Sequence, residues 1–154
     1  LDLVEQIDSI LQETGLKPSS LTLEITETIV MENSEEAALM LLRLKALGVG
    51  LSIDDFGTGY SSLSRLHSFP VNTLKIDRSF VNQIGSSGEN SEIVQAIVML
   101  AEQIGVGVTA EGVETTAQLT KLKELKCDEA QGYFFARPLS AQAAQELIAA
   151  SPQW

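Results

Sequence analysis

The stretch LSIDDFGTGYSS (residues 51–62) places an aliphatic strand directly before two adjacent aspartates and a turn flanked by glycines. Leu51 and Ile53 alternate with Ser52 and Asp54, which is the period of a β-strand. Two neighbouring carboxylates repel each other, so a buried strand that ends in such a pair raises the question of what compensates their charge. An aspartate before glycine is more often a turn or cap residue, so the interpretation depends on the residues at the ends of the other strands.

Strand-like and helix-like segments alternate along the whole chain. Strands are predicted for residues 21–26, 51–54, 73–77, 107–111 and 131–136. Helices are predicted for residues 3–14, 61–66, 92–104 and 115–126, and from Ser140 onward; a further helix, which Asn33 or Ser34 can cap, is predicted to run to about Leu47. This alternation indicates an α/β fold with parallel strands and right-handed crossovers, either as part of a barrel or as an open doubly wound sheet. We expect one domain over residues 1–154 with about five βα units, fewer than the eight of a closed barrel.

Charged residues occupy equivalent places on four of these strands. Each lies near the carboxyl end, on the face opposite the aliphatic residues: Glu24, Asp54, Lys75 and Glu111. Parallel strands that are covered on both faces normally read as continuous apolar runs, so the pattern needs a cause. A barrel lumen supplies one, because its charged groups converge at the end where barrel active sites lie. A partial TIM barrel is therefore the favoured architecture.

Convergent carboxylates predict a metal site. Without a cation, bringing Glu24, Asp54, Asp55 and Glu111 together would force some of them to stay protonated. Mg²⁺ and Mn²⁺ prefer oxygen ligands and would keep these groups ionised. Lys75 among them suits a contact with a substrate phosphate or a water, and the alternative is a structural ion pair with Asp55 or Glu111.

Composition limits the possible partners. The chain has 10 Lys and Arg against 21 Asp and Glu, a net charge of −11. Such a surface repels nucleic-acid polymers and anionic lipid, so neither binding to them nor direct membrane contact is expected. With one cysteine, Cys127, no internal disulfide can form, and we expect a reducing, cytoplasmic location.

Five ordered motifs resemble one known family. They are LEITET (23–28), IDDFGTGYSSL (53–63), LKIDRSFV (74–81), TAEGVET (109–115) and AQGYFFARP (130–138). Together they are similar to the consecutive signature motifs of the EAL-domain family of cyclic-di-GMP phosphodiesterases. The resemblance implies a modified TIM barrel that hydrolyses cyclic-di-GMP to linear pGpG with two Mg²⁺ or Mn²⁺ ions.

The resemblance also implies roles for the acidic cluster. Glu24, Asp54 and Asp55 would ligate metal, with the two aspartates bridging or holding a second ion. Glu111 would be a ligand of the second metal or a general base, and Lys75 would orient the attacking water and contact the substrate.

Four further positions carry over from the family. Gln131 would contact the substrate, and Glu114 would be a supporting carboxylate. Glu27 would anchor the loop that follows Asp55. Arg137 and Pro138 would close the last strand.

The match starts partway through the family's pattern. The Glu-Ala-Leu motif and a following asparagine ligand belong to strands that would precede residue 1, so the chain corresponds to the fourth through eighth strands. We therefore expect this chain to be inactive alone and to associate edge to edge or as a homodimer. In the parent protein we expect fused sensor or diguanylate cyclase-type domains, and a membrane anchor there would lie in such domains.

Two other functions remain open at this point. The chain could belong to a degenerate EAL domain that binds cyclic-di-GMP or a partner without hydrolysis. It could also belong to an unrelated metal-dependent barrel hydrolase or lyase.

Overall fold

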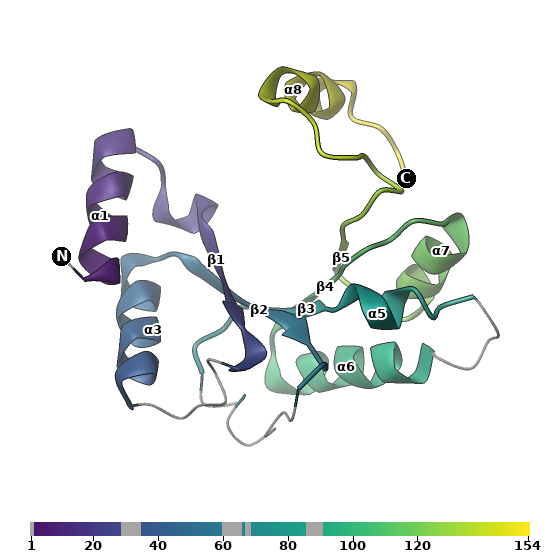
Figure 1. The fold of residues 1–154 in the computed structure, drawn as a ribbon, viewed down its shortest axis with the longest axis horizontal. Coiled ribbons are helices and arrows are strands. Elements are labelled where there is room, and N and C mark those ends of the chain that lie inside the picture. The colour runs from purple at the N-terminus through teal and green to yellow at the C-terminus, as the bar shows by residue number, and fades with distance from the viewer. Residues whose placement is uncertain (1, 29–34, 60–65, 67–68, 86–90) are drawn as a thin grey trace.

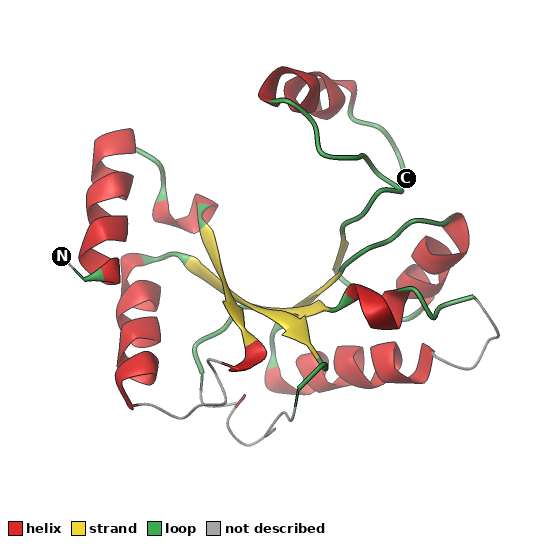
Figure 2. Cartoon of the chain, in the orientation of Figure 1, coloured by secondary structure: helices red, strands yellow, loops and turns green. Residues whose placement is uncertain are grey.

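The structure, a computed structural model, describes residues 2–28, 35–59, 66, 69–85 and 91–154. Its strands form one parallel sheet, in which each strand pairs with the next along the chain (Figure 2). They are β1 (Thr22–Thr26), β2 (Gly50–Phe56), β3 (Thr73–Ile76), β4 (Gly107–Ala110) and β5 (Glu129–Ala130). A parallel sheet in chain order is the arrangement of consecutive βα units in a barrel, which confirms the predicted fold class.

Helices connect the strands and cover the outside of the curved sheet, while α8 projects beyond the end of β5 (Figure 1). In chain order they are α1 (Leu3–Thr14), the 3₁₀ helix η1 (Pro18–Ser20), α3 (Glu35–Leu47), α5 (Arg78–Val81), α6 (Ser91–Ile104), α7 (Thr116–Glu124) and α8 (Ala141–Ala150). In the described part of the chain, none of the helices is long and apolar enough to cross a membrane.

Local sequence explains several helix ends. Asp2 caps α1 by accepting a hydrogen bond from the Glu5 N–H, and Gly15 ends the helix with a left-handed φ of 68°. Thr115 and Gln118 form a capping box at the start of α7, each side chain accepting the other residue's backbone N–H. α1 therefore has the predicted bounds, whereas α7, predicted for residues 115–126, covers Thr116–Glu124.

The core lies between the sheet and the outer helices. Leu51, Ile53, Leu74 and Ile76 are all fully buried there. They pack with aliphatic side chains of α3 and α6, among them Leu41, Leu44, Val94 and Ala101. Because successive side chains on a strand point to opposite faces, this packing leaves the polar residues of β1 to β4 on the inner face.

The structure corrects the prediction for the last strand. A strand was expected over residues 131–136, but β5 contains only Glu129–Ala130, and residues 133–135 form a turn. The turn lies against the end of β4: a Cβ on Gly132 would come within 2.2 Å of the Val113 carbonyl oxygen, and the Phe134 N–H donates to that oxygen. Of the helix predicted over residues 61–66, only Leu66 lies within the described residues.

Candidate metal centre

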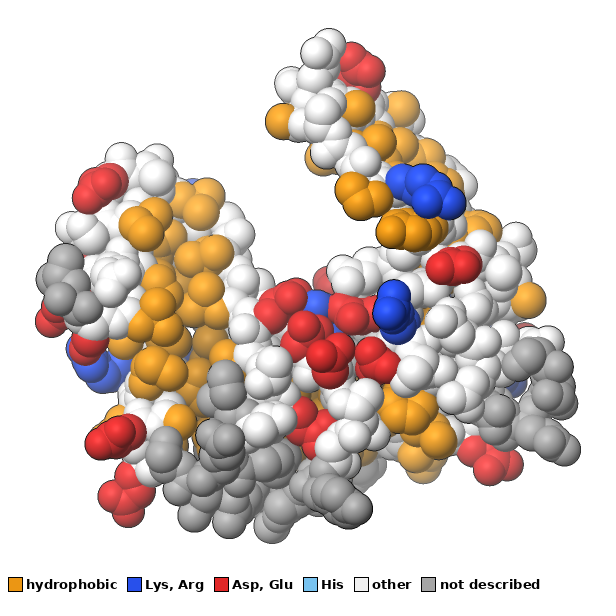
Figure 3. All heavy atoms as spheres, viewed as in Figure 1, with side chains coloured by type: hydrophobic (Ala, Val, Ile, Leu, Met, Phe, Trp, Pro, Cys, Tyr) orange, Lys and Arg blue, Asp and Glu red, His pale blue; other side chains and the backbone are white. Residues whose placement is uncertain are grey.

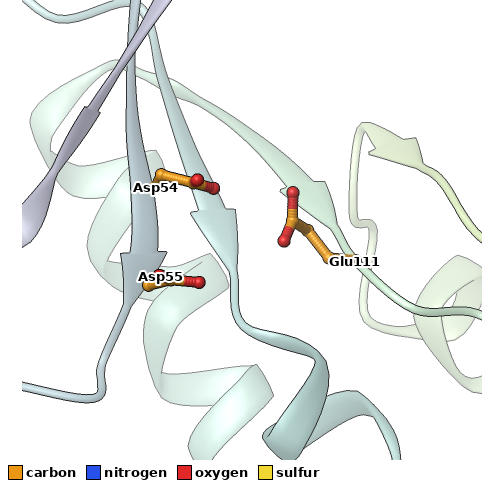
Figure 4. A group of neighbouring side chains, drawn as sticks. All are labelled: Asp54, Asp55 and Glu111. Atoms are coloured by element: carbon orange, nitrogen blue, oxygen red, sulfur yellow. The ribbon is translucent and has the colours of Figure 1, made fainter.

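A bulge in β2 places the two adjacent aspartates on one side of the sheet. Ile53 pairs with Leu74 and Phe56 with Ile76, so β2 has one more residue than β3 over this interval. Within it, Asp55 has a left-handed φ of 52°, a conformation that aspartate tolerates better than most residues. A regular strand would point Asp54 and Asp55 to opposite faces. The bulge instead turns both carboxylates toward Glu111, as Figure 4 shows.

These three carboxylates form a compact cluster. One oxygen from each of Asp54, Asp55 and Glu111 can be chosen so that all three lie within 4.8 Å of one another. Glu111 directly follows β4, and its N–H donates to the Ile76 carbonyl at the end of β3. The cluster thus lies at the carboxyl ends of neighbouring parallel strands, where barrel enzymes hold their active sites.

Lys75 lies at the centre of the cluster and brings Glu24 into it. Its Nζ is 2.6 Å from Glu24 Oε1, 2.9 Å from Asp54 Oδ1 and 2.5 Å from Glu111 Oε1. Lys75 is only 6% exposed, because β3 lies between β2 and β4. One ammonium therefore meets three carboxylates, and the centre keeps an excess of negative charge. In Figure 3 acidic side chains gather around a blue group on this face.

The pKa shifts follow from this arrangement. Burial alone would lower the pKa of Lys75, but hydrogen bonds to Glu111, Glu24 and Asp54 outweigh it and raise that pKa above its usual range. Partial removal from water, together with the charges of Asp54 and Asp77, raises the pKa of Asp55. Lys75 therefore stays charged at neutral pH, while the charge on Asp55 is disfavoured in the absence of a cation.

Glu27, which directly follows β1, does not join the cluster but holds the loop that follows the bulge. This residue is 5% exposed, and its Oε2 accepts hydrogen bonds from the Gly57 N–H at 3.0 Å and the Gly59 N–H at 3.3 Å. A Cβ on Gly59 would lie 2.9 Å from Glu27 Oε1, so only glycine fits there without displacing the carboxylate. The buried carboxylate thus fixes the backbone directly after Asp55.

A pocket of about 390 Å³ adjoins the cluster. Gln131 links the two, because its Nε2 donates to Glu111 Oε1 at 2.7 Å. Glu114, predicted to be a supporting carboxylate, and Arg137, predicted to close the last strand, line this pocket and lie outside the acidic cluster. Pro138 also lines the pocket but closes no strand, since β5 ends at Ala130.

The candidate site assembled from sequence misses two residues. Asp77, beside Asp55, caps α5 by accepting hydrogen bonds from the Ser79 backbone and hydroxyl. Burial alone would raise the pKa of Asp77, but these hydrogen bonds outweigh it and lower the pKa. Arg78 lines the pocket. A signal for Asp77 is present in the sequence, because it follows Lys75 by two residues on the polar side of strand 73–77.

Comparison with protein families gives a match over most of the chain. The family model described as EAL domain matches residues 1–138. A curated relative, the cyclic di-GMP phosphodiesterase NbdA of Pseudomonas aeruginosa, is 47% identical over 148 residues, which are 96% of this chain and 19% of NbdA.

Solved structures share the fold. A structure described as the PaMucR phosphodiesterase in complex with c-di-GMP superposes with a TM-score of 0.88 at 43% identity, covering 92% of this chain and 57% of that one. Klebsiella pneumoniae BlrP1 with manganese and cy-diGMP gives a TM-score of 0.81 at 37% identity, covering 89% and 35%. This chain thus spans about a fifth of the full length of NbdA and over half of the MucR phosphodiesterase chain.

Proposed function

This chain belongs to the EAL domain family, and we propose that it forms the larger part of the active site of a phosphodiesterase that hydrolyses cyclic-di-GMP to linear pGpG. One observation carries the proposal: a bulged strand, β2, turns two adjacent aspartates toward Glu111 around the buried Lys75. Two relatives described as phosphodiesterases, NbdA and MucR, support the reaction.

The donor set fits Mg²⁺ or Mn²⁺. Asp54, Asp55 and Glu111 offer carboxylate oxygens close to one another, and hard divalent cations take such ligands. A fourth carboxylate, that of Glu24, lies beside these three because it pairs with the Lys75 ammonium, as do two of them. Two such ions bound by these residues would polarise the phosphodiester and lower the pKa of a water.

Other roles in the proposed reaction fall to side chains around the metal site. We assign Lys75 to hold and orient the attacking water, since its ammonium is buried and fully charged. Glu111 would ligate a second ion or accept the proton of that water, and Gln131, hydrogen-bonded to Glu111, would contact the substrate. Glu27 keeps the backbone after Asp55 in place. Glu114 lines the neighbouring pocket as a supporting carboxylate.

The whole protein is proposed to be larger than this chain. Residues 1–154 would be one part of a single EAL domain, fused to sensor or diguanylate cyclase-type domains, because the chain covers only 19–24% of its curated relatives. The name of one relative, bifunctional MucR, includes a diguanylate cyclase. We further propose a homodimer, and a cytoplasmic location on the basis of the single cysteine.

The test is hydrolysis by the full-length protein. With excess Mn²⁺, we expect conversion of cyclic-di-GMP to pGpG, and we expect Asp54→Asn and Asp55→Asn to abolish it because each removes a ligand charge. Asp8→Asn on α1 is the matched control and should retain the wild-type rate. Full activity in Asp55→Asn would refute the two-metal assignment, and tight binding without turnover in the wild type would identify a receptor instead.

A further inference from the structure

A buried hydroxyl on the inner face of the sheet has no partner. Ser52 lies in β2, two residues before Asp54, and is 3% exposed. Among the residues that the structure describes, its Oγ is the only buried side-chain nitrogen or oxygen without a hydrogen bond. A buried hydroxyl that is left unpaired costs free energy, so a second state of the site in which Ser52 is paired would be favoured.

Ser52 lies beside the ion pair between Lys75 and Glu24. Glu24 is opposite Ser52 in the register of β1 and β2, and Lys75 belongs to β3, on the other side of β2. The 2.6 Å contact between Lys75 Nζ and Glu24 Oε1 therefore spans β2 on the face that carries Ser52. Atoms of this chain already cover the Ser52 oxygen, so its partner must come from a neighbouring side chain that moves.

Lys75 can become that partner when its carboxylates bind metal. An ammonium donates three hydrogen bonds, and three carboxylates surround the one of Lys75 here. Asp54 and Glu111 are also candidate metal ligands, and a divalent cation would compete for the oxygens that contact Lys75. Lys75 would then have a free donor on the face that carries the unpaired Ser52 oxygen.

We propose that Ser52 is a positioning residue, whose hydroxyl accepts a hydrogen bond from Lys75 once the carboxylates are bound to metal. The bond would keep the ammonium in place over β2 while its former partners serve as ligands. The part that concerns the attacking water rests on the proposed function, whereas the pairing of Ser52 with Lys75 can be measured from metal binding alone.

Titration calorimetry of the metal-free full-length protein with Mn²⁺ tests the pairing. The new hydrogen bond forms as the metal binds and therefore favours binding. Ser52→Ala should weaken Mn²⁺ affinity about tenfold, the effect of one hydrogen bond to a charged group. In a Lys75→Met background the same substitution should have no effect, because the donor is gone. An unchanged affinity in Ser52→Ala, or an equal loss in both backgrounds, would overturn the inference.

Thermal unfolding in metal-free buffer separates this role from a structural one. Ser52→Ala should not lower the metal-free Tm, because the hydroxyl has no partner to lose. Thr109→Val is the matched control: Thr109 is also buried on the inner face, but its hydroxyl donates to Glu129 Oε2 at 3.1 Å. The control should lose Tm and retain Mn²⁺ affinity. A loss of metal-free Tm in Ser52→Ala as large as in Thr109→Val would contradict the proposal.

Hydrolysis tests the consequence for Lys75. With saturating Mn²⁺, Ser52→Ala should lower kcat several-fold and leave KM nearly unchanged, because Lys75 is assigned to the attacking water. An unchanged kcat would refute the positioning role. If the wild type hydrolysed no cyclic-di-GMP but Ser52→Ala still weakened Mn²⁺ binding only when Lys75 was present, the proposed function would fail and the pairing would stand.

Discussion

Replacing Lys75 by methionine removes the one cation that holds three carboxylates together. The Lys75 and Glu111 side chains are 8% and 16% exposed, so their 2.5 Å contact is a buried ion pair. Asp54 is partly buried and Glu24 is half exposed, so those two contacts add less. Removing one partner of a buried pair costs ~3–5 kcal/mol, because the other charge is left uncompensated. In a domain of this size, that loss lowers the Tm by roughly 6–20 °C.

Thermal unfolding followed by circular dichroism, in metal-free buffer and with saturating Mn²⁺, measures this effect in a chain that holds the whole EAL domain. A cation at a hundred times its Kd stabilises the folded state by ~2.7 kcal/mol. Lys75 and the metal share carboxylate oxygens, so Mn²⁺ should raise the Tm of Lys75→Met more than that of the wild type. The protonation state of Lys75 does not complicate the assay. Its pKa is raised, so its contribution is complete below the ordinary lysine pKa of ~10.4 and disappears only above it.

Lys121→Met is the matched control. Lys121 pairs with Glu124 at 3.2 Å, but both side chains are exposed, and such pairs contribute ~0–1 kcal/mol. The reasoning fails if Lys75→Met unfolds within roughly 2 °C of the wild type, since a buried pair cannot cost so little. It also fails if Mn²⁺ raises the Tm of Lys75→Met and the Tm of the wild type by the same amount.

Three further predictions concern the same site. Asp55→Asn should raise the metal-free Tm at neutral pH, because the raised pKa of Asp55 means that its negative charge destabilises the folded state. This gain in Tm should vanish as the pH falls below ~4, the ordinary aspartate pKa, and a gain that is independent of pH would contradict this cause. Glu27→Gln should weaken the binding of both Mn²⁺ and cyclic-di-GMP in calorimetric titrations, and it should lower folding stability by ~1–3 kcal/mol because two charge-assisted hydrogen bonds become neutral. Wild-type affinities in this variant would mark Glu27 as an ordinary carboxylate. The isolated 154-residue chain should associate in light scattering and hydrolyse negligible cyclic-di-GMP, because β1 and β5 have unpaired edges in the described sheet; an active monomer would refute this.

The alternation of residues along the strands was sufficient to predict the inner face of the sheet. Glu24, Lys75 and Glu111 each occupy the polar side of a strand at its carboxyl end, and parallel strands bring those ends to one edge. The structure brings all three within contact of one another through Lys75. This part of the site follows from a period of two residues, which is a local property of each strand.

The position of Asp55 depends on the tertiary structure. The sequence predicts that both aspartates serve one metal site, but a period of two residues places Asp54 and Asp55 on opposite faces and gives no means of bringing them together. The extra residue that unites them is visible only in the pairing of β2 with β3. A bulge is a property of two paired strands, so the pattern within a single strand cannot show it.

The end of the sheet shows the same limit. A strand over residues 131–136 was predicted from the local sequence, but Gly132 approaches Val113 closely and residues 133–135 form a turn there. That turn, together with the end of β4, lets Arg78 and Tyr133 line one pocket. The alternation of apolar and polar residues along each strand, and the positions of its charged residues, are local properties that the sequence alone determined. Bulges, turns between strands and pockets arise when segments distant in sequence meet, and only the packed structure decided them.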